Sequence, residues 1–206
     1  MKRIVIASSN PGKLREFRRL CEPLGLDIVA QSELGIADAE EPHFTFVENA
    51  LAKARHASRA SGLPAFADDS GICAAALNGA PGVHSARYAD GTAPRDTQDA
   101  RNNAKLIAAL AGNTDRRAHY ICVIVFVRGA NDPEPIIAEG RWHGEIIDTP
   151  RGDDGFGYDP YFYLPGLRKT AAELPPDEKN LISHRGQALA KLIALLRESA
   201  YVKGEG

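Results

Sequence analysis

The stretch Tyr120-Ile121-Cys122-Val123-Ile124-Val125-Phe126-Val127 decides the fold, because it is the strongest strand signal in the sequence. Successive strand residues point to opposite faces of a sheet, and here both alternating faces are apolar. A strand of that kind is typical of the centre of a sheet that is covered on each side. The sequence therefore predicts a central strand at 120–127.

The segments on either side extend this core. Asn131-Asp132-Pro133 is a turn signal, and the segment 136–147 after it is predicted to be an antiparallel neighbour of the central strand. The other expected elements are two shorter strands, at 3–7 and 65–67, and four helices, at 13–21, 46–60, 96–111 and 184–197. Together they predict an α/β fold with a long mixed central sheet flanked by helices.

Length and composition limit the function classes. The chain has 206 residues and a net charge of −2, with 25 Lys and Arg against 27 Asp and Glu. This length suits a single domain over residues 1–206, without a separable linker. The near-neutral charge argues against a nucleic-acid binder, which needs a basic surface. No stretch approaches the roughly 20 apolar residues of a membrane span, so no membrane partner is expected.

The cysteines indicate a reducing compartment. Cys21, Cys73 and Cys122 are odd in number, and none forms a C-x-x-C pair. The apolar run Ile4–Ala7 is too short for a signal peptide. We therefore expect reduced thiols and a cytoplasmic location.

The first candidate site is Ser8-Ser9-Asn10-Pro11-Gly12-Lys13, between a predicted strand and a predicted helix. Free backbone N–H groups and the helix dipole at such a turn favour an anion, and Lys13 adds a positive charge. The segment is not a P-loop, because the first glycine of that motif is missing and Leu14 follows the lysine. An ordinary turn with Asn10 as helix cap explains the pattern equally well.

The second candidate is Asp68-Asp69-Ser70, which follows the short predicted strand 65–67. Carboxylates at a strand end are suited to Mg²⁺ or to deprotonating a water. The alternative, favoured on the pattern alone, is an Asp-rich turn. Glu40 and Glu41 offer further carboxylates, with a solvated acidic loop as the alternative.

The helix predicted at 46–60 adds a cation. Thr45-Phe46-Val47-Glu48 fits a capping box, so Glu48 is expected to close the start of this helix. Asn49 and Lys53 are four residues apart and share a face, from which Lys53 can reach a phosphate. An ordinary exposed lysine is the alternative.

Two further candidates lie near the C-terminus. In Gly155-Phe156-Gly157-Tyr158-Asp159-Pro160, glycines around an aromatic let a flat ligand approach, and Phe156 is suited to stacking on a base. A turn with a core aromatic is the alternative. Lys179 and the run Ser183-His184-Arg185 supply donors, with His184 and Arg185 expected on the exposed first turn of the last helix. A solvated cap is the alternative there.

At this point the sequence resembles a known family, the inosine triphosphate pyrophosphatases. The resemblance runs nearly end to end and rests on six motifs in the family's order. These are Ser8–Lys13, Thr45–Ala50, Ala67–Gly71, Pro81–Tyr88, Gly155–Pro160 and Ser183–Arg185. The family often has Thr-Gly-Asn where this chain has Ser8-Ser9-Asn10, which leaves open which hydroxyl touches phosphate.

The resemblance implies two α/β lobes with a nucleotide cleft between them, a homodimer, and Mg²⁺-dependent hydrolysis of ITP, dITP and XTP to the monophosphate and pyrophosphate. Asp69 would be the general base and a metal ligand, assisted by Glu41 or, less favourably, Glu40. The residues that would contact substrate are Ser8, Ser9, Asn10, Pro11, Gly12, Lys13, Lys53, Ser70, Phe156, Gly157, Tyr158, Asp159, Lys179, His184 and Arg185. The alternative is a Maf-like pyrophosphatase acting on modified pyrimidine nucleotides.

Overall fold

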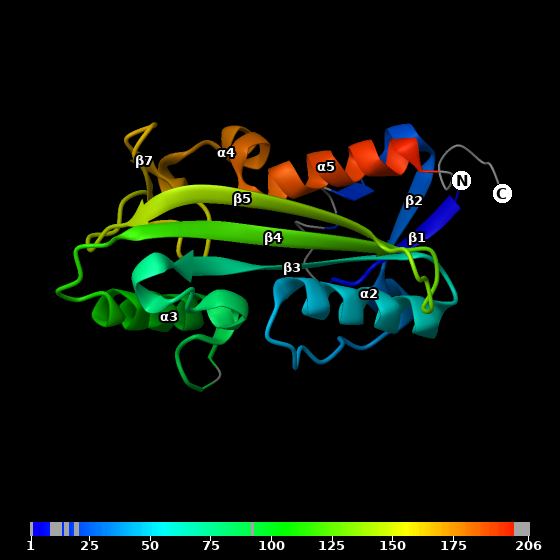
Figure 1. Ribbon diagram of the computed structural model, residues 1–206, viewed down its shortest axis with the longest axis horizontal. Coiled ribbons are helices and arrows are strands. Elements are labelled where there is room, and N and C mark those ends of the chain that lie inside the picture. The colour runs from blue at the N-terminus through cyan, green and yellow to red at the C-terminus, as the bar shows by residue number, and fades with distance from the viewer. Residues whose placement is uncertain (1, 9–13, 15–16, 19–20, 92, 200–206) are drawn as a thin grey trace. The chain divides into compact units, whose positions relative to one another are not determined.

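The chain forms a seven-stranded mixed sheet flanked by helices (Figure 1). The computed structural model describes residues 2–8, 14, 17–18, 21–91 and 93–199. The strands, in chain order, are β1 Lys2–Ile6, β2 Leu26–Ala30, β3 Ala65–Ala74, β4 Arg117–Val127, β5 Ile136–Ile146, β6 Phe162–Leu164 and β7 Lys169–Thr170. Their order in the sheet is β2-β1-β3-β4-β5-β6-β7.

The pairing makes the sheet mixed, as the sequence predicts. β1 runs parallel to both β2 and β3, whereas β5 and β6, and then β6 and β7, pair antiparallel. β4 lies in the middle of the order, and every residue from Tyr120 to Val127 is buried. The predicted α/β fold class and the central strand are therefore confirmed.

The helices α2 Phe46–Ser61, α3 Arg95–Ala109 and α5 His184–Glu198 match predicted segments closely. The short helix α4 Pro176–Ile182 was not predicted. Within the predicted helix 13–21, the described residues Leu14, Phe17, Arg18 and Cys21 are helical. None of the helices that the structure describes is both long and apolar enough to span a membrane.

Local sequence explains where two helices begin. Thr45 caps α2: its hydroxyl accepts the Glu48 N–H at 3.3 Å and donates to the Glu48 carboxylate at 2.6 Å. The Thr45 side chain thus caps the helix as the predicted capping box requires, while the Glu48 carboxylate accepts from the Thr45 hydroxyl. Ser183 caps α5, since its hydroxyl accepts the Gly186 N–H at 3.2 Å.

The sequence reading missed four elements, of which β2 matters most. Leu26–Ala30 alternates buried and half-buried residues and pairs with β1 over its whole length. β6, β7 and α4 were also missed, because each is short. Residues 151–160, which include the glycine-rich motif Gly155–Pro160, form a loop.

The chain divides into two compact units. The first comprises Met1–Asp69, Val123–Glu139 and Ala188–Gly206, and the second comprises Ser70–Cys122 and Gly140–Gln187. Each crossing from one unit to the other falls inside a regular element, namely β3, β4, β5 or α5. No linker separates the two units at these crossings, and the single domain over 1–206 remains a prediction.

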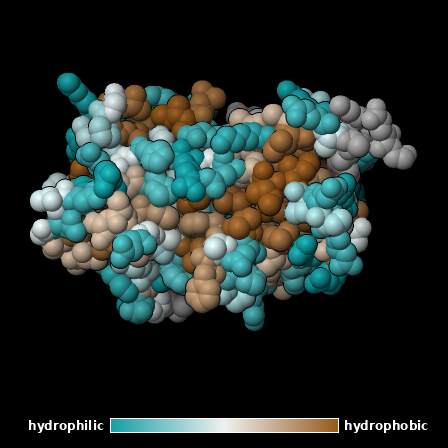
Figure 2. Space-filling model, in the orientation of Figure 1, coloured by the Kyte–Doolittle hydropathy of each residue, from teal (hydrophilic) through white to brown (hydrophobic). Residues whose placement is uncertain are grey.

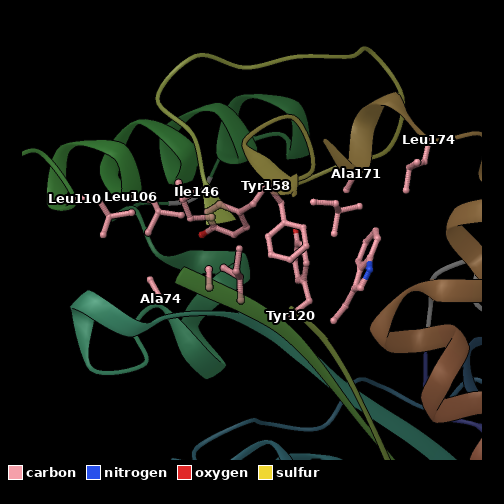
Figure 3. Packing of buried hydrophobic residues seen from close by; sticks show 13 residues of the cluster. Ala74, Leu106, Leu110, Tyr120, Ile146, Tyr158, Ala171 and Leu174 are labelled. Atoms are coloured by element: carbon pink, nitrogen blue, oxygen red, sulfur yellow. The ribbon is translucent and has the colours of Figure 1, made fainter. Parts of the chain in front are cut away.

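Each unit has its own aromatic core. In the first, Phe66 of β3 lies between Phe17 and Phe126, with ring centroids 5.6 and 4.9 Å away. In the second, Leu106 of α3 and Leu110, which directly follows that helix, pack with the buried residues that Figure 3 shows, among them Ile146 and Tyr158. Burial of these large apolar side chains is the main source of each unit's stability.

Some apolar side chains remain on the surface, where Figure 2 shows them among polar ones. The exposed large apolar residues of the part that the structure describes are Leu34, Phe44, Val47, Ile137, Phe156, Leu167, Leu181 and Leu195. Phe156 is half-exposed, whereas Tyr158 and Asp159 of the same loop are buried. Such a ring is available to stack on a ligand.

Candidate active site

The two adjacent aspartates lie inside a strand and not in a turn. β3 begins at Ala65 and continues through Asp68 and Asp69 to Ala74, so the strand predicted at 65–67 is confirmed but is longer than predicted, and the Asp-rich turn is wrong. Asp68 is 4% exposed and Asp69 8% exposed. Aspartate disfavours strands, but here the surrounding sheet overrides that local preference. A buried carboxylate requires a partner, and Asp69 has two.

Lys53 of α2 is the first partner. Its ammonium lies 2.7 Å from Glu41 Oε1 and 3.1 Å from Asp69 Oδ1. The Lys53 side chain is 13% exposed, which excludes the ordinary exposed lysine. Lys53 therefore joins a loop carboxylate to a strand carboxylate at one point.

Asn49 is the second partner, and the sequence reading left it out of the site. It is fully buried and donates from Nδ2 to Asp69 Oδ2 at 3.4 Å. The same side chain accepts the His43 N–H at 3.0 Å and donates to the His43 carbonyl at 3.2 Å. Asn49 thus fixes the loop two residues beyond Glu41. Its place one helical turn before Lys53 was the available signal.

Burial and charge set the ionisation of the cluster. Burial raises the pKa of Asp69 above its ordinary value, and the attraction of Lys53 only partly offsets this. Burial alone lowers the pKa of Lys53, but the carboxylates around it, above all Asp69 and Glu41, outweigh burial and raise that pKa. The pKa values of both groups can rise together, because several carboxylates favour the charged form of Lys53, while Lys53 is the one cation among the described residues that favours the charged form of Asp69. Asp69 is therefore a more basic carboxylate than an ordinary aspartate.

The donor set suits a hard cation. Carboxylate oxygens are the ligands that Mg²⁺ prefers, and it usually takes one or two of them together with substrate phosphates. Asp69 and Glu41 meet that need, while Glu40 is exposed. Among the residues that the structure describes, no three His, Cys, Asp or Glu side chains form a metal-binding group.

The predicted phosphate turn is described only at its start. Ser8 follows β1, and the Ala7 N–H donates to the Phe66 carbonyl at 2.7 Å. The chain therefore leaves β1 beside the strand that carries Asp69. Ser9, Asn10, Pro11, Gly12 and Lys13 lie outside the described residues.

The second unit carries the predicted base-binding loop. Asp159, which is 3% exposed, accepts the Phe156 N–H at 2.8 Å and the Lys179 ammonium at 2.5 Å on Oδ2. The ammonium also lies 5.1 Å from the centre of the Phe156 ring. A Cβ on Gly155, whose φ is +85°, would lie 2.4 Å from Asp159 Oδ2, so this close approach requires glycine. These contacts hold a half-exposed ring beside a cation. The alternative interpretation of Phe156 as a core aromatic is therefore excluded.

Tyr158 takes a supporting position. Its side chain is 4% exposed and packs in the apolar core of the second unit (Figure 3). Its hydroxyl donates to the Ser85 carbonyl at 2.8 Å. The neighbouring Gly157 presents its backbone to α3, where Asp99 and Asn103 contact it.

The start of α5 differs from the exposed turn that the sequence predicts. His184 is 9% exposed and stacks on Tyr120, with ring centroids 4.7 Å apart and planes at 9°. Arg185 is half-buried and donates to Ser70 Oγ at 3.4 Å. The prediction of an exposed turn was wrong because Tyr120, on a distant part of the chain, covers the imidazole. The solvated cap is excluded for the same reason.

Tyr120 is a second residue that the sequence reading missed. Its hydroxyl donates to Asp159 Oδ1 at 3.3 Å, while its ring supports His184. Burial, together with the Asp159 charge, raises the pKa of Tyr120 well above its ordinary value, so the hydroxyl stays a donor. Tyr120 therefore links two predicted site residues, Asp159 and His184.

The whole chain can be compared with known proteins. Residues 4–195 match the Ham1 family. The chain belongs to this family. A dITP/XTP pyrophosphatase of Ralstonia nicotianae is 68% identical over 197 residues, which are 96% of this chain and 98% of that one. A protein of the same name from Nitrosomonas europaea is 62% identical over 202 residues, 98% of each chain.

Solved structures of the Ham1 family agree in fold. A HAM1 protein from Coxiella burnetii is 51% identical, covers 97% of this chain and 100% of its own, and superposes with a TM-score of 0.92. The family that the six motifs indicate is therefore confirmed.

Proposed function

We propose that this Ham1 family member hydrolyses dITP, ITP and XTP to the nucleoside monophosphate and pyrophosphate. The names of its close relatives support this activity. The observation that carries it is the buried cluster in which Lys53 joins Asp69 and Glu41. In this cluster the Asp69 carboxylate can accept a proton, and the Lys53 ammonium supplies a positive charge for a phosphate.

The reaction follows from the roles of these residues. Asp69 accepts a proton from a water whose oxygen attacks the α-phosphorus, and the bond from that phosphorus to the bridging oxygen breaks. The electron pair leaves with pyrophosphate. Lys53 stabilises charge on the phosphates, together with Ser8, Ser9, Asn10, Pro11, Gly12 and Lys13. Asn49 keeps Asp69 in place through its hydrogen bond.

Magnesium fits the carboxylate pair of Asp69 and Glu41, with Glu41 favoured over the exposed Glu40. When bound, Mg²⁺ supplies charge neutralisation for the triphosphate. Its absence from the reaction mixture is expected to abolish turnover.

The residues of the second unit are proposed to select the base. Phe156 stacks on the purine, with Gly157 beside it and Tyr158 supporting the loop. Donors from Lys179, His184 and Arg185 suit the keto group that hypoxanthine and xanthine carry at C6, where adenine has an amino group. A site built for one leaves polar groups unpaired with the other, which is costly. Asp159 and Ser70 hold Lys179 and Arg185.

The assembly and location are part of the same proposal. We expect a single domain of two lobes with the nucleotide in a cleft, acting as a homodimer in the cytoplasm. Cys21, Cys73 and Cys122 form no disulfide among the described residues, which agrees with a reducing compartment. Size-exclusion chromatography with light scattering tests the dimer.

The decisive experiment measures pyrophosphate release from ITP, XTP, GTP and ATP with Mg²⁺ present. Rates on ITP and XTP well above those on GTP and ATP are expected. The variant Asp69→Asn should lose about 10²–10⁴-fold in rate, the contribution of a general base. Equal rates on all four nucleotides, or a folded Asp69→Asn protein with near-normal turnover, would contradict the proposal.

A further inference from the structure

Gly157, the residue after Phe156, is held at both of its backbone groups by one face of α3. Its N–H donates to Asp99 Oδ2 at 2.9 Å, and its carbonyl accepts from Asn103 Nδ2 at 2.8 Å. Asp99 and Asn103 are four residues apart, so they lie one above the other on the helix. A single helical turn therefore grips the loop beside the half-exposed ring.

The stability of α3 does not explain why an asparagine occupies position 103. Its Nδ2 also donates to the Asp99 carbonyl at 2.9 Å, and two carbonyl partners fix which end of the amide faces them. Oδ1 then has no hydrogen-bond partner among the described residues. This is unusual, because Asn103 is buried, with only 7% of its surface exposed. An unpaired buried acceptor is destabilising. An apolar side chain of the same size would avoid that cost.

The preceding residue of α3, Asn102, holds the segment that supports the loop from the other side. Asn102 Oδ1 accepts the Ala89 N–H at 2.7 Å, and Asn102 Nδ2 donates to the Ala86 carbonyl at 3.1 Å. The neighbouring Ser85 carbonyl accepts the Tyr158 hydroxyl. Two adjacent asparagines thus fix the loop directly and the segment on which Tyr158 rests.

Phe156 needs such support, because half of the residue is exposed and its loop is irregular. The ring is 50% exposed, and the loop has positive φ at Gly155 and Gly157 and no regular structure. An irregular loop with glycines has many alternative conformations. A platform of this kind binds tightly only if it is ordered before the ligand arrives.

We infer that Asp99 and Asn103 are positioning residues of the base site, which hold Gly157 so that the Phe156 ring is in place before the nucleotide binds. The inference rests on the proposed function. Neither residue takes part in the phosphate chemistry, so their loss weakens substrate binding and leaves the chemical step unchanged.

Three variants test this. Asn103→Leu removes both the donor and the orphaned acceptor, and its melting temperature is expected to equal or exceed that of the unaltered chain. Asp99→Ala removes the acceptor of the Gly157 N–H, whereas Asp99→Asn keeps an oxygen there and should rescue most of the effect. Asp90→Ala is the control, because the Asp90 side chain is fully exposed in the same unit.

Two readouts are needed. Hydrogen exchange on the unliganded chain should speed up in the peptide over residues 155–159 for Asn103→Leu and Asp99→Ala only. The KM for ITP should then rise by about threefold to tenfold, the effect of one lost hydrogen bond, while kcat changes less than about twofold.

The outcomes separate the two proposals. Unchanged exchange in this peptide, or faster exchange with an unchanged KM, overturns the inference. A fall in kcat with an unchanged KM overturns it as well. If the unaltered chain does not release pyrophosphate from ITP, the proposed function fails, whatever the exchange shows about the loop.

Discussion

Replacing Lys53 by Met tests the charge cluster that the proposed function depends on. The ammonium lies 2.7 Å from Glu41 and 3.1 Å from Asp69. At such distances one pair attracts by about 5 kcal/mol at an effective dielectric constant of about 20. Met keeps the apolar stem and removes the charge, so the buried carboxylate of Asp69 and the half-buried carboxylate of Glu41 lose the cation between them.

The expected loss is about 3–5 kcal/mol of unfolding free energy at pH 7, the usual cost of removing one partner of a buried ion pair. For a chain of this size, that loss lowers the melting temperature by on the order of 10 °C. Asp69→Asn alone is expected to melt at or above the temperature of the unaltered chain, because burial raises the pKa of Asp69 and its charge is costly at neutral pH.

The pH dependence has a definite sign. A group whose pKa is raised by folding favours the folded state below its unfolded pKa, and this contribution is lost as the pH rises through the folded pKa. Without Lys53 the pKa of Asp69 rises further. The deficit of Lys53→Met should therefore shrink as the pH is lowered from 7 toward 4.

The assay is thermal melting followed by circular dichroism, at pH 7 and at pH 4.5. The double variant Lys53→Met with Asp69→Asn should regain much of the stability that Lys53→Met loses, since it also removes the buried Asp69 charge that Lys53 compensated. Lys105→Met is the matched control, because Lys105 is 43% exposed and its partner Asp90 is fully exposed. The reasoning is refuted if Lys53→Met melts like Lys105→Met at pH 7, or if the double variant is no more stable than Lys53→Met.

Three other predictions concern activity and thiol reactivity. The kcat/KM for ITP should fall as the pH drops through the pKa of Asp69, which burial places above its ordinary value; a rate that stays constant from pH 8 to pH 4 would contradict the general-base role. Phe156→Ala should raise the KM for ITP by about 10-fold to 100-fold, the effect of losing 1–3 kcal/mol of stacking, with an unchanged melting temperature; an unchanged KM would exclude stacking. In the folded chain, iodoacetamide should label the half-buried Cys73 before Cys21, because Cys21 is fully buried and burial raises its pKa to about 12; mass spectrometry of the labelled peptides checks the order, and earlier labelling of Cys21 would be evidence against it.

Several elements were predictable because their signals are local. The doubly apolar run at 120–127 indicates the centre of a sheet, and β4 lies there. The box formed by Thr45 and Glu48 predicts the start of α2. The alternation in Leu26–Ala30 was also present in the sequence, so β2 was a missed signal and not a hidden one.

The sequence by itself determined the fold class, the family and the identity of the candidate chemical groups, because period, capping and motif spacing are written in neighbouring residues. Only the tertiary structure decided that Asp68 and Asp69 lie within a strand, that His184 is stacked under Tyr120, and that α3 holds Gly157. The physical reason is the same in each case. A buried charge or ring is tolerated only when partners from distant parts of the chain compensate it, and no local pattern encodes which partners those are.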